Sequence, residues 1–225
     1  MEDRLAAQYQ RRFEIEHEQR LAVWRTLIDA WFNRYLVDVD SILDLGCGWG
    51  SFVNQIDVRD RYAIDLNPDA GRRVDSSVEL FMQPASARWP LPDASLDLVF
   101  TSNFLEHLET RKEIASTLAE AYRCLRPRAR MVCLGPNIRY AGAAYWDFFD
   151  HVVPLTERSL VEALEVAGFE TELVIPRFLP YTMAGKRAPR SLAIRTYLRC
   201  PPMWRLLGKQ FLVVVGKPAR LDKDS

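Results

Sequence analysis

The chain has 225 residues, enough for one large domain with a buried core. Its 48% hydrophobic and 27% charged residues are typical of a folded globular protein and exclude a disordered chain. No apolar run approaches the ~20 residues of a membrane span, and the charged N-terminus lacks the apolar core of a signal peptide. Four scattered cysteines without a CxxC pair indicate reduced thiols. We therefore expect a cytoplasmic protein.

The net charge is zero, but the charges are segregated along the chain. Ten basic residues and no Asp or Glu lie between Leu173 and Leu221. Residues 1–172 instead carry 19 basic and 28 acidic residues. This asymmetry favours an anionic partner for the C-terminal part.

Apolar spacing predicts strands that alternate with helices. Helical periodicity covers residues 5–36, and its polar first half suggests a separate helix. Strands are expected at 41–45, 62–64, 78–82, 96–101, 130–134, 169–175 and 211–215. Helices are expected from Ser51 towards Ile56, opening at Pro68, over 111–125, between Thr156 and Gly168, and over 190–199. This alternation predicts a doubly wound α/β fold with a seven-stranded, mostly parallel sheet.

The expected elements divide the chain into three parts. An N-terminal helical extension covers residues 1–40, the α/β domain covers 41–217, and a tail covers 218–225. A basic, partly helical insertion at 177–208 separates the last two strands.

The segment 42–52, "ILDLGCGWGSF", runs from a strand into a loop with Gly46, Gly48 and Gly50. Glycine allows positive φ and lets a ligand lie against the backbone. The acid before this loop, Asp44, either braces it or accepts a hydrogen bond from a ligand ammonium group. Asp65 ends the second strand, where it either binds a ribose diol or caps a helix ahead of Pro68.

The glycine spacing separates two classes of nucleotide ligand. A dinucleotide site prefers GxGxxG/A, with its third small residue at position 51. Ser51 stands there, and Gly50 makes the pattern GxGxG instead. A nicotinamide-dependent oxidoreductase is therefore disfavoured, although it stays open as an alternative.

Five segments in order resemble class I S-adenosylmethionine-dependent methyltransferases. They are "ILDLGCGWGSF", "AIDLNPD", "LPDASLDLVFTSNFLEHL", "AYRCLRPRARMV" and "DHVVPLTERSLVEALEVAGFE". The resemblance covers residues 40–176 and is greatest to the bacterial branch that modifies small molecules and polysaccharides. It implies S-adenosylmethionine as cofactor and S-adenosylhomocysteine as product, without specifying the acceptor.

The resemblance also implies which residues contact the cofactor. The methionine part would lie along Gly46, Cys47, Gly48 and Gly50, with Asn103 facing its end. The ribose would bind Asp65, and the adenine would lie beside Leu66, Ala85 and Ser86.

One position departs from the family pattern. Many members have an Asp in the adenine loop, where this chain has Pro84. Ser86, a backbone carbonyl or simple packing must then hold the adenine.

Methyl transfer from a sulfonium needs positioning, and a general base only for a weak nucleophile such as a sugar hydroxyl. His107 is one candidate base, with a structural place near the cofactor as its alternative. His151 is the other, unless it is a loop residue bonded to Asp147 or Asp150. Together, Asp147, Asp150 and His151 could bind a metal ion, but we favour a polar loop and predict no metal. The third histidine, His17, is expected at the surface.

Two segments suggest how an acceptor is bound. The loop "GPNIRYAGAAYWDFFDH" holds five aromatic residues, which either form a lid or acceptor wall or pack into the core. The insertion 177–208 is either a cap with a solvated basic face, a site for an anionic acceptor, or a contact with the anionic inner membrane surface. Nucleic acid is disfavoured because no RNA-binding motif is present.

These observations together predict a methyltransferase for a small molecule or glycan intermediate, anionic or lipid-linked, with oxygen as the favoured acceptor atom. The alternative is a protein with the same cofactor-binding fold that binds without catalysis and acts as a partner subunit.

Overall fold

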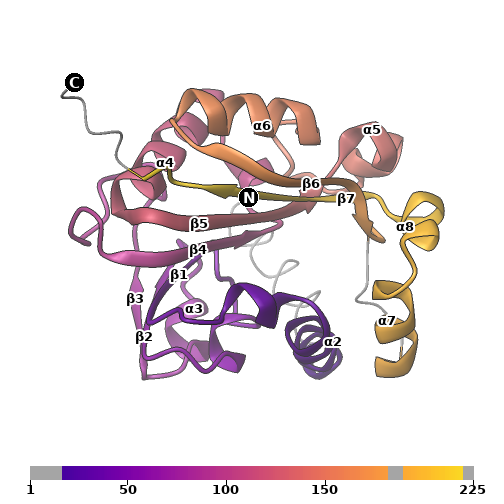
Figure 1. Cartoon of the computed structure of the whole chain (residues 1–225), viewed down its shortest axis with the longest axis horizontal. Coiled ribbons are helices and arrows are strands. Elements are labelled where there is room, and N and C mark those ends of the chain that lie inside the picture. The colour runs from indigo at the N-terminus through magenta and orange to yellow at the C-terminus, as the bar shows by residue number, and fades with distance from the viewer. Residues whose placement is uncertain (1–16, 182–189, 220–225) are drawn as a thin grey trace.

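A seven-stranded sheet organises the computed structural model, which describes residues 17–181 and 190–219 (Figure 1). Its strands are β1 (Ser41–Leu45), β2 (Asp60–Ile64), β3 (Val78–Phe81), β4 (Leu96–Ser102), β5 (Leu125–Pro136), β6 (Glu170–Leu179) and β7 (Gln210–Gly216). The strand order is β3-β2-β1-β4-β5-β7-β6. Strand β7 runs antiparallel to both neighbours, and the other pairs are parallel. The predicted α/β fold is confirmed.

Helices cover both faces of the sheet. They are α2 (His17–Ala30), α3 (Ala70–Arg73), α4 (Arg111–Cys124), α5 (Ile138–Ala141), α6 (Glu157–Val166), α7 (Ser191–Leu198) and α8 (Pro201–Leu207). Short 3₁₀ turns are η1 (Phe32–Tyr35), η2 (Val53–Gln55), η3 (Leu105–His107) and η4 (Gly142–Asp147). Figure 1 shows α6 on one face and α2 on the other. Within the described ranges, no helix is long and apolar enough to cross a bilayer.

Two large hydrophobic clusters form most of the core, one on each face of the sheet, and a third, smaller cluster includes Val53 and Ala63. Successive residues of a central strand alternate between the two large clusters. In β4, Val99 lies in one cluster, and Leu98 and Phe100 lie in the other. One cluster includes Leu118 of α4 and Leu160 of α6. Both helices begin at a capping box, and the predicted Thr156 cap accepts a hydrogen bond from the backbone N–H of Ser159 at 3.1 Å.

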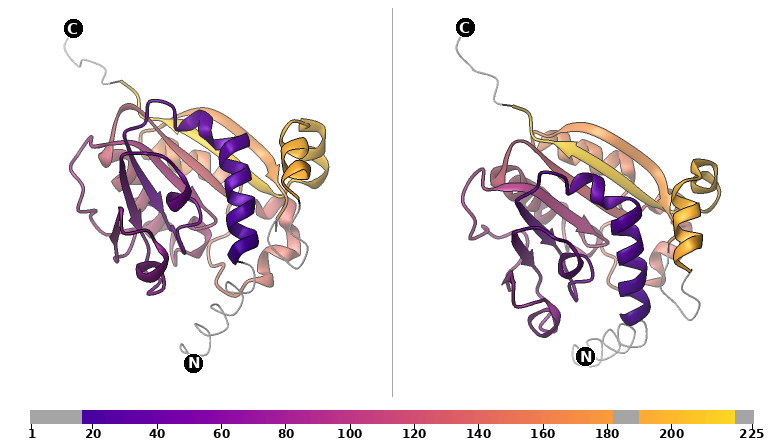
Figure 2. Two further views of the ribbon diagram at one scale, coloured as in Figure 1. Left: turned by 90° about the horizontal axis from the view of Figure 1, so that it is seen from below. Right: turned by 60° about the horizontal axis from the view of Figure 1, so that its bottom comes forward.

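The N-terminal segment forms part of the second cluster. Val23 and Leu27 of α2 are buried there, and the Phe32 ring packs edge-on against Phe100 at 5.3 Å. Helix α2 also contacts α7, since Asp29 and Arg195 form an ion pair at 3.3 Å. Figure 2 shows the two helices side by side. The segment 17–35 thus closes one face of the sheet.

Two of the expected helices differ near the glycine loop. Residues 51–56 contain the single 3₁₀ turn η2 rather than an α-helix, because the backbone becomes extended at Ile56, directly after the turn. The Asn54 side chain in this turn bonds the backbone of Arg73 and Asp75. Helix α3 starts at Ala70, so Pro68 precedes it and does not open it.

The C-terminal half also departs from expectation. Strand β5 extends beyond the predicted 130–134 at both ends, and β6 continues past residue 175 to Leu179. Helix α8 was not predicted, although Pro201 and Pro202 fit its first turn. The first half of the predicted N-terminal helix and part of the basic insertion, residues 182–189, lie outside the described residues.

The burial of Phe32 gives a stability test. Replacing it with Ala should lower the free energy of unfolding by roughly 3–5 kcal/mol, because a fully buried aromatic ring leaves a cavity. The nearby Val37→Ala, at a side chain 69% exposed, should change it by about 0.5 kcal/mol or less. Urea denaturation measures both. Equal stabilities of Phe32→Ala and wild type would mean that the segment is a loose extension.

Candidate active site

A cavity of about 620 Å³ opens where the parallel strands end. It lies between the loops after β1, β2 and β4, the end of β5 and the start of β7 at Gln210. Ligand pockets usually measure roughly 300–1,000 Å³, and ligands of open α/β sheets bind beyond the carboxyl ends of the strands. Volume and position both mark this cavity as the candidate site.

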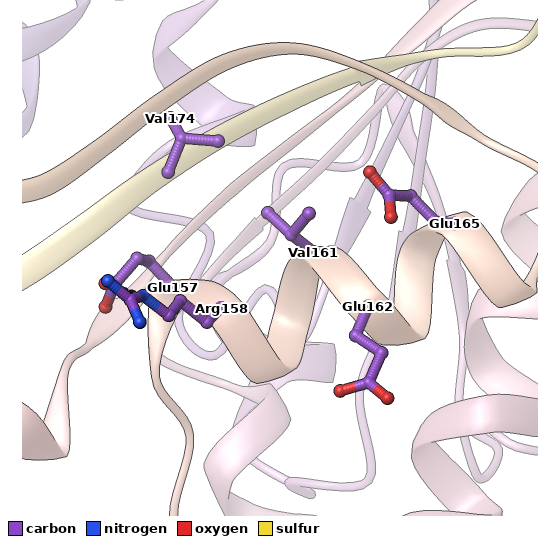
Figure 3. A pocket seen from close by; sticks show the side chains of 6 residues that line it. All are labelled: Glu157, Arg158, Val161, Glu162, Glu165 and Val174. Atoms are coloured by element: carbon purple, nitrogen blue, oxygen red, sulfur yellow. Dashed lines mark ion pairs between the residues drawn. The ribbon is translucent and has the colours of Figure 1, made fainter.

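A second hollow of about 280 Å³ shares no lining residue with this cavity. Figure 3 shows its lining, which consists of Glu157, Arg158, Val161, Glu162, Glu165 and Val174. All but Val174 project from α6, and Arg158 pairs with Glu157 at 3.8 Å. This open, acidic hollow is smaller than most ligand pockets, and we assign it no function.

The three loop glycines all have positive φ, for different reasons. A Cβ at Gly46 would overlap the Phe104 ring, and one at Gly50 would lie 2.7 Å from the Asn54 amide. A Cβ at Gly48 would meet nothing within 4 Å, and Gly48 lines the cavity. Packing therefore explains Gly46 and Gly50. Gly48 leaves its backbone open to a ligand, as the cofactor prediction requires.

Asp65 fastens the glycine loop to the end of β2. Its carboxylate accepts hydrogen bonds from the backbone N–H of Gly48 at 2.6 Å and of Asn67 at 2.8 Å. The alternative that Asp65 caps the next helix is wrong, because Asp69 holds the N-cap position of α3. Each carboxylate oxygen keeps a second lone pair, so Asp65 can still accept from ligand hydroxyls.

Asp44 is buried below the loop, with 3% of its surface exposed. Burial, assisted by the negative charge of Asp65, raises its pKa to about 8, while a hydrogen bond from the Val53 backbone opposes the shift. A ligand cation in the cavity would favour the charged form of Asp44. The carboxyl group is thus suited to sense a positive ligand.

The opposite end of the cavity contains Asn103, His107 and His151. Asn103 has a φ of 50°, an uncommon conformation that asparagine tolerates. His107 Nδ1 lies 2.9 Å from the backbone oxygen of Asp150. Because a carbonyl can only accept, Nδ1 carries the proton and Nε2 is the free acceptor of the neutral ring. The rings of His107 and His151 lie 4.9 Å apart, centre to centre.

Sequence reasoning missed the buried carboxyl group between these histidines. Glu106 is 1% exposed and lines the cavity, and burial raises its pKa to about 7. Among the described residues, its Oε1 has no hydrogen-bond partner. The signal was present in "FLEHL", where Glu106 directly precedes His107 in the turn after β4.

The cavity brings together only some of the predicted site residues. Those that line it are Asp44, Gly46, Cys47, Gly48, Asp65, Asn103, His107 and His151. Those outside its lining are Gly50, Leu66, Ala85 and Ser86. Leu66 is 61% exposed, and the Ala85 carbonyl accepts from the Trp89 ring N–H at 2.8 Å. Their adenine contacts stay predictions.

Helix α2 supplies a wall that sequence reasoning assigned to an extension. Arg20, Val23, Trp24 and Leu27 line the cavity. The Trp24 ring also packs edge-on against Phe52 and Phe100, each at 5.9 Å. From the aromatic loop, Phe148 joins the lining, whereas Tyr145 is buried and Phe149 is exposed.

Known proteins resemble this chain in sequence and in fold. Residues 43–133 match a family described as "Methyltransferase domain". A Mycolicibacterium smegmatis protein named "Probable S-adenosylmethionine-dependent methyltransferase" is 29% identical over 63% of this chain and 60% of its own length. The chain thus spans less than two thirds of that relative.

Solved structures extend the similarity over most of the chain. A SAM-dependent methyltransferase from Archaeoglobus fulgidus aligns with a TM-score of 0.63 and 21% identity, over 86% of this chain and 94% of its own. The [4+2]-cyclase SpnF aligns with a TM-score of 0.59 and 20% identity, over 87% of this chain and 81% of its own.

The sequence match, the sheet order and the glycine loop agree. Residues 43–133 thus resemble a methyltransferase domain in sequence, the chain has the fold of class I methyltransferases, and S-adenosylmethionine is the cofactor that this resemblance implies. The open backbone at Gly48 fits that cofactor.

The buried Asp44 predicts how stability changes with pH. Its pKa is about 8 in the folded chain and 3.8 ordinarily, so folding takes up a proton between these values. The free energy of unfolding should fall as pH rises through this window. The free energy of unfolding of Asp44→Asn should fall less steeply with pH than that of wild type. The exposed control Asp57→Asn should show the same slope as wild type. Urea denaturation at pH 5.5 and pH 8 measures the slopes. Parallel slopes for Asp44→Asn and wild type would contradict a protonated Asp44.

Proposed function

We propose that this chain transfers a methyl group from S-adenosylmethionine to an oxygen of a small molecule or glycan intermediate. The observation that carries the proposal is the open backbone at Gly48, held by Asp65 at the ligand edge of a methyltransferase domain. The bound cofactor supplies a methyl group activated by the adjacent sulfonium. The protein must then position the acceptor and exclude water.

The cofactor end of the cavity would hold a cationic amino acid and a ribose. Gly46, Cys47 and Gly48 present backbone to the methionine part. Asp65 would accept from the ribose hydroxyls through its remaining lone pairs. Asp44, buried beneath them, would balance the positive charge of the ligand.

The acceptor end lies around Asn103, where the histidines gather. His107 presents Nε2 as an acceptor, because its Nδ1 donates to Asp150. His107 or His151 would take the acceptor proton as the oxygen attacks. Phe148, stacked on His151 with ring centres 5.0 Å apart, offers a wall for a sugar or planar group.

The fold alone does not decide between catalysis and binding, because a [4+2]-cyclase shares it. Incubating the protein with methyl-labelled cofactor and a metabolite extract separates these possibilities. The proposal expects a labelled product, formed at a much lower rate by Asp65→Ala when the cofactor is below saturation. Tight cofactor binding without label transfer would instead favour the partner-subunit alternative.

The proposed ribose contact gives a second test. Asp65→Ala should weaken S-adenosylhomocysteine binding by about 30- to 150-fold, since two charge-assisted hydrogen bonds worth a net 2–3 kcal/mol are lost. Isothermal calorimetry measures this loss, and Asp69→Ala on the next helix is the control. NAD should bind neither protein, and saturable NAD binding alone would contradict the cofactor assignment.

The basic insertion supports an anionic acceptor or a peripheral contact with anionic lipid. Part of its charge serves the fold, because Arg177 bonds the backbone of Leu206 and Gly208, and Arg195 pairs with Asp29. Arg190, Arg199 and Arg205 are exposed on α7, α8 and their flanks, close in sequence to the exposed Leu192 and Leu206. Basic and apolar side chains together suit a glycan carried on a lipid phosphate.

The exposed arginines make this contact testable. Replacing Arg190, Arg199 and Arg205 with Gln should weaken binding to vesicles that contain anionic lipid and leave cofactor binding unchanged. Added salt should weaken wild-type binding, since exposed charges are screened over about 8–10 Å. The matched control replaces exposed Arg72, Arg111 and Lys112. Vesicle sedimentation that shows no difference between the two triple variants would remove the lipid contact.

A further inference from the structure

Three side chains converge at the acceptor end of the cavity. Glu106, His107 and His151 each direct a potential ligand atom to one place, and these atoms lie within 4.8 Å of one another. Glu106 and His107 belong to η3, whereas His151 follows the aromatic loop. The fold thus brings together residues more than forty positions apart in sequence.

The surroundings of His107 prepare it to bind a cation. Its Nδ1 donates to the Asp150 backbone oxygen at 2.9 Å, and the Asp150 carboxylate lies 3.5 Å from the same nitrogen. Metal-binding histidines are usually oriented by such a bond from the second ring nitrogen. The lone pair of Nε2 is therefore directed away from Asp150.

Glu106 provides an independent indication of a ligand. Its side chain is 1% exposed, yet Oε1 has no hydrogen-bond partner among residues 17–181 and 190–219. A buried carboxyl oxygen without a partner destabilises the fold, because it loses its hydrogen bonds to water and forms none within the protein. A cation at the cluster would satisfy it.

We propose that Glu106, His107 and His151 bind a divalent transition-metal ion next to the cofactor site. Imidazole suits Zn²⁺ and similar ions, and a carboxylate adds the negative charge that they require. Two ligand atoms about 2.1 Å from one ion lie at most about 4.2 Å apart, so the cluster must close slightly around it. Three protein ligands leave coordination positions for the acceptor.

This site differs from the predicted one. The sequence interpretation considered Asp147, Asp150 and His151 and favoured no metal. In the structure only His151 of that trio belongs to the cluster, while Asp150 orients His107 and the exposed Asp147 does not line the cavity.

The ion would explain how a hydroxyl group becomes a methyl acceptor, a role that rests on the proposed function. A bound divalent ion lowers the pKa of a coordinated hydroxyl, as it does for water. Because the free ring nitrogens of His107 and His151 would then hold the ion, neither histidine would act as the general base. The acceptor oxygen would instead lose its proton to solvent, form the bond to the methyl carbon, and release the thioether product as the carbon–sulfur bond breaks. The acceptor is then an oxygen compound able to coordinate the ion.

Metal binding can be tested without any acceptor. The full chain is treated with chelator, and calorimetry then measures Zn²⁺ binding while visible absorption follows Co²⁺. One ion per chain should bind, with Mg²⁺ much weaker. Glu106→Gln, His107→Gln and His151→Gln should each weaken binding by roughly tenfold or more, since even residues behind the ligands often cost that much. Asp147→Asn, the matched control, should bind as wild type does.

The outcomes separate the metal site from the proposed function. Binding of S-adenosylhomocysteine shows whether each variant is folded. Zn²⁺ binding that is unchanged in a folded Glu106→Gln and a folded His107→Gln would overturn the metal site, as would no binding to wild type. Specific metal binding without transfer of labelled methyl would support the site and contradict the methyltransferase proposal. Equal transfer in chelator-treated protein would overturn the role of the ion in catalysis.

Discussion

The hydrogen bond from the Gly48 backbone to the Asp65 carboxylate, at 2.6 Å, holds the candidate site together. It joins the loop after β1 to the end of β2, two strands that are neighbours in the sheet. Because Asp65 also accepts from Asn67, its position is fixed at both oxygens. The loop therefore presents its open backbone at Gly48 in one orientation. Asp65 keeps a lone pair on each oxygen for the proposed ribose contact.

Charge is distributed unequally along the cavity that this bond organises. At the cofactor end, burial raises the pKa of Asp44, and the negative charge of the nearby Asp65 raises it further. At the acceptor end, Glu106 is buried beside two histidines. Both ends thus contain carboxyl groups whose charged forms require a positive partner. A cationic cofactor at one end and a metal ion at the other would supply these partners.

The sequence predicted the features that depend on local patterns. The seven strands, the Thr156 cap and the glycine loop follow from residue types at short spacing, and the structure contains them, although several strand ends differ from the predicted ones. The seven-stranded, mostly parallel sheet was predicted from the alternation of strands and helices, whereas its strand order was not predicted. Eight predicted site residues line the cavity because carboxyl ends of parallel strands meet at one edge.

Features that depend on distant contacts could not be predicted in this way. Nothing in residues 51–56 indicates that Asn54 bonds the backbone of Arg73, or that the backbone becomes extended at Ile56 where a helix was predicted. The role of α2 as a cavity wall depends on its packing against Phe52 and Phe100. Glu106 appeared to be an ordinary charged residue until the fold buried it beside His151.

A crystal structure with S-adenosylhomocysteine tests the central claim most directly. The account predicts the methionine part of the ligand against the backbone of Gly48, within van der Waals distance, and both ribose hydroxyls within hydrogen-bond distance of Asp65. It also predicts the ligand sulfur directed towards Asn103 and the histidine pair. A ligand bound elsewhere, or one whose ribose lies away from Asp65, would contradict the account.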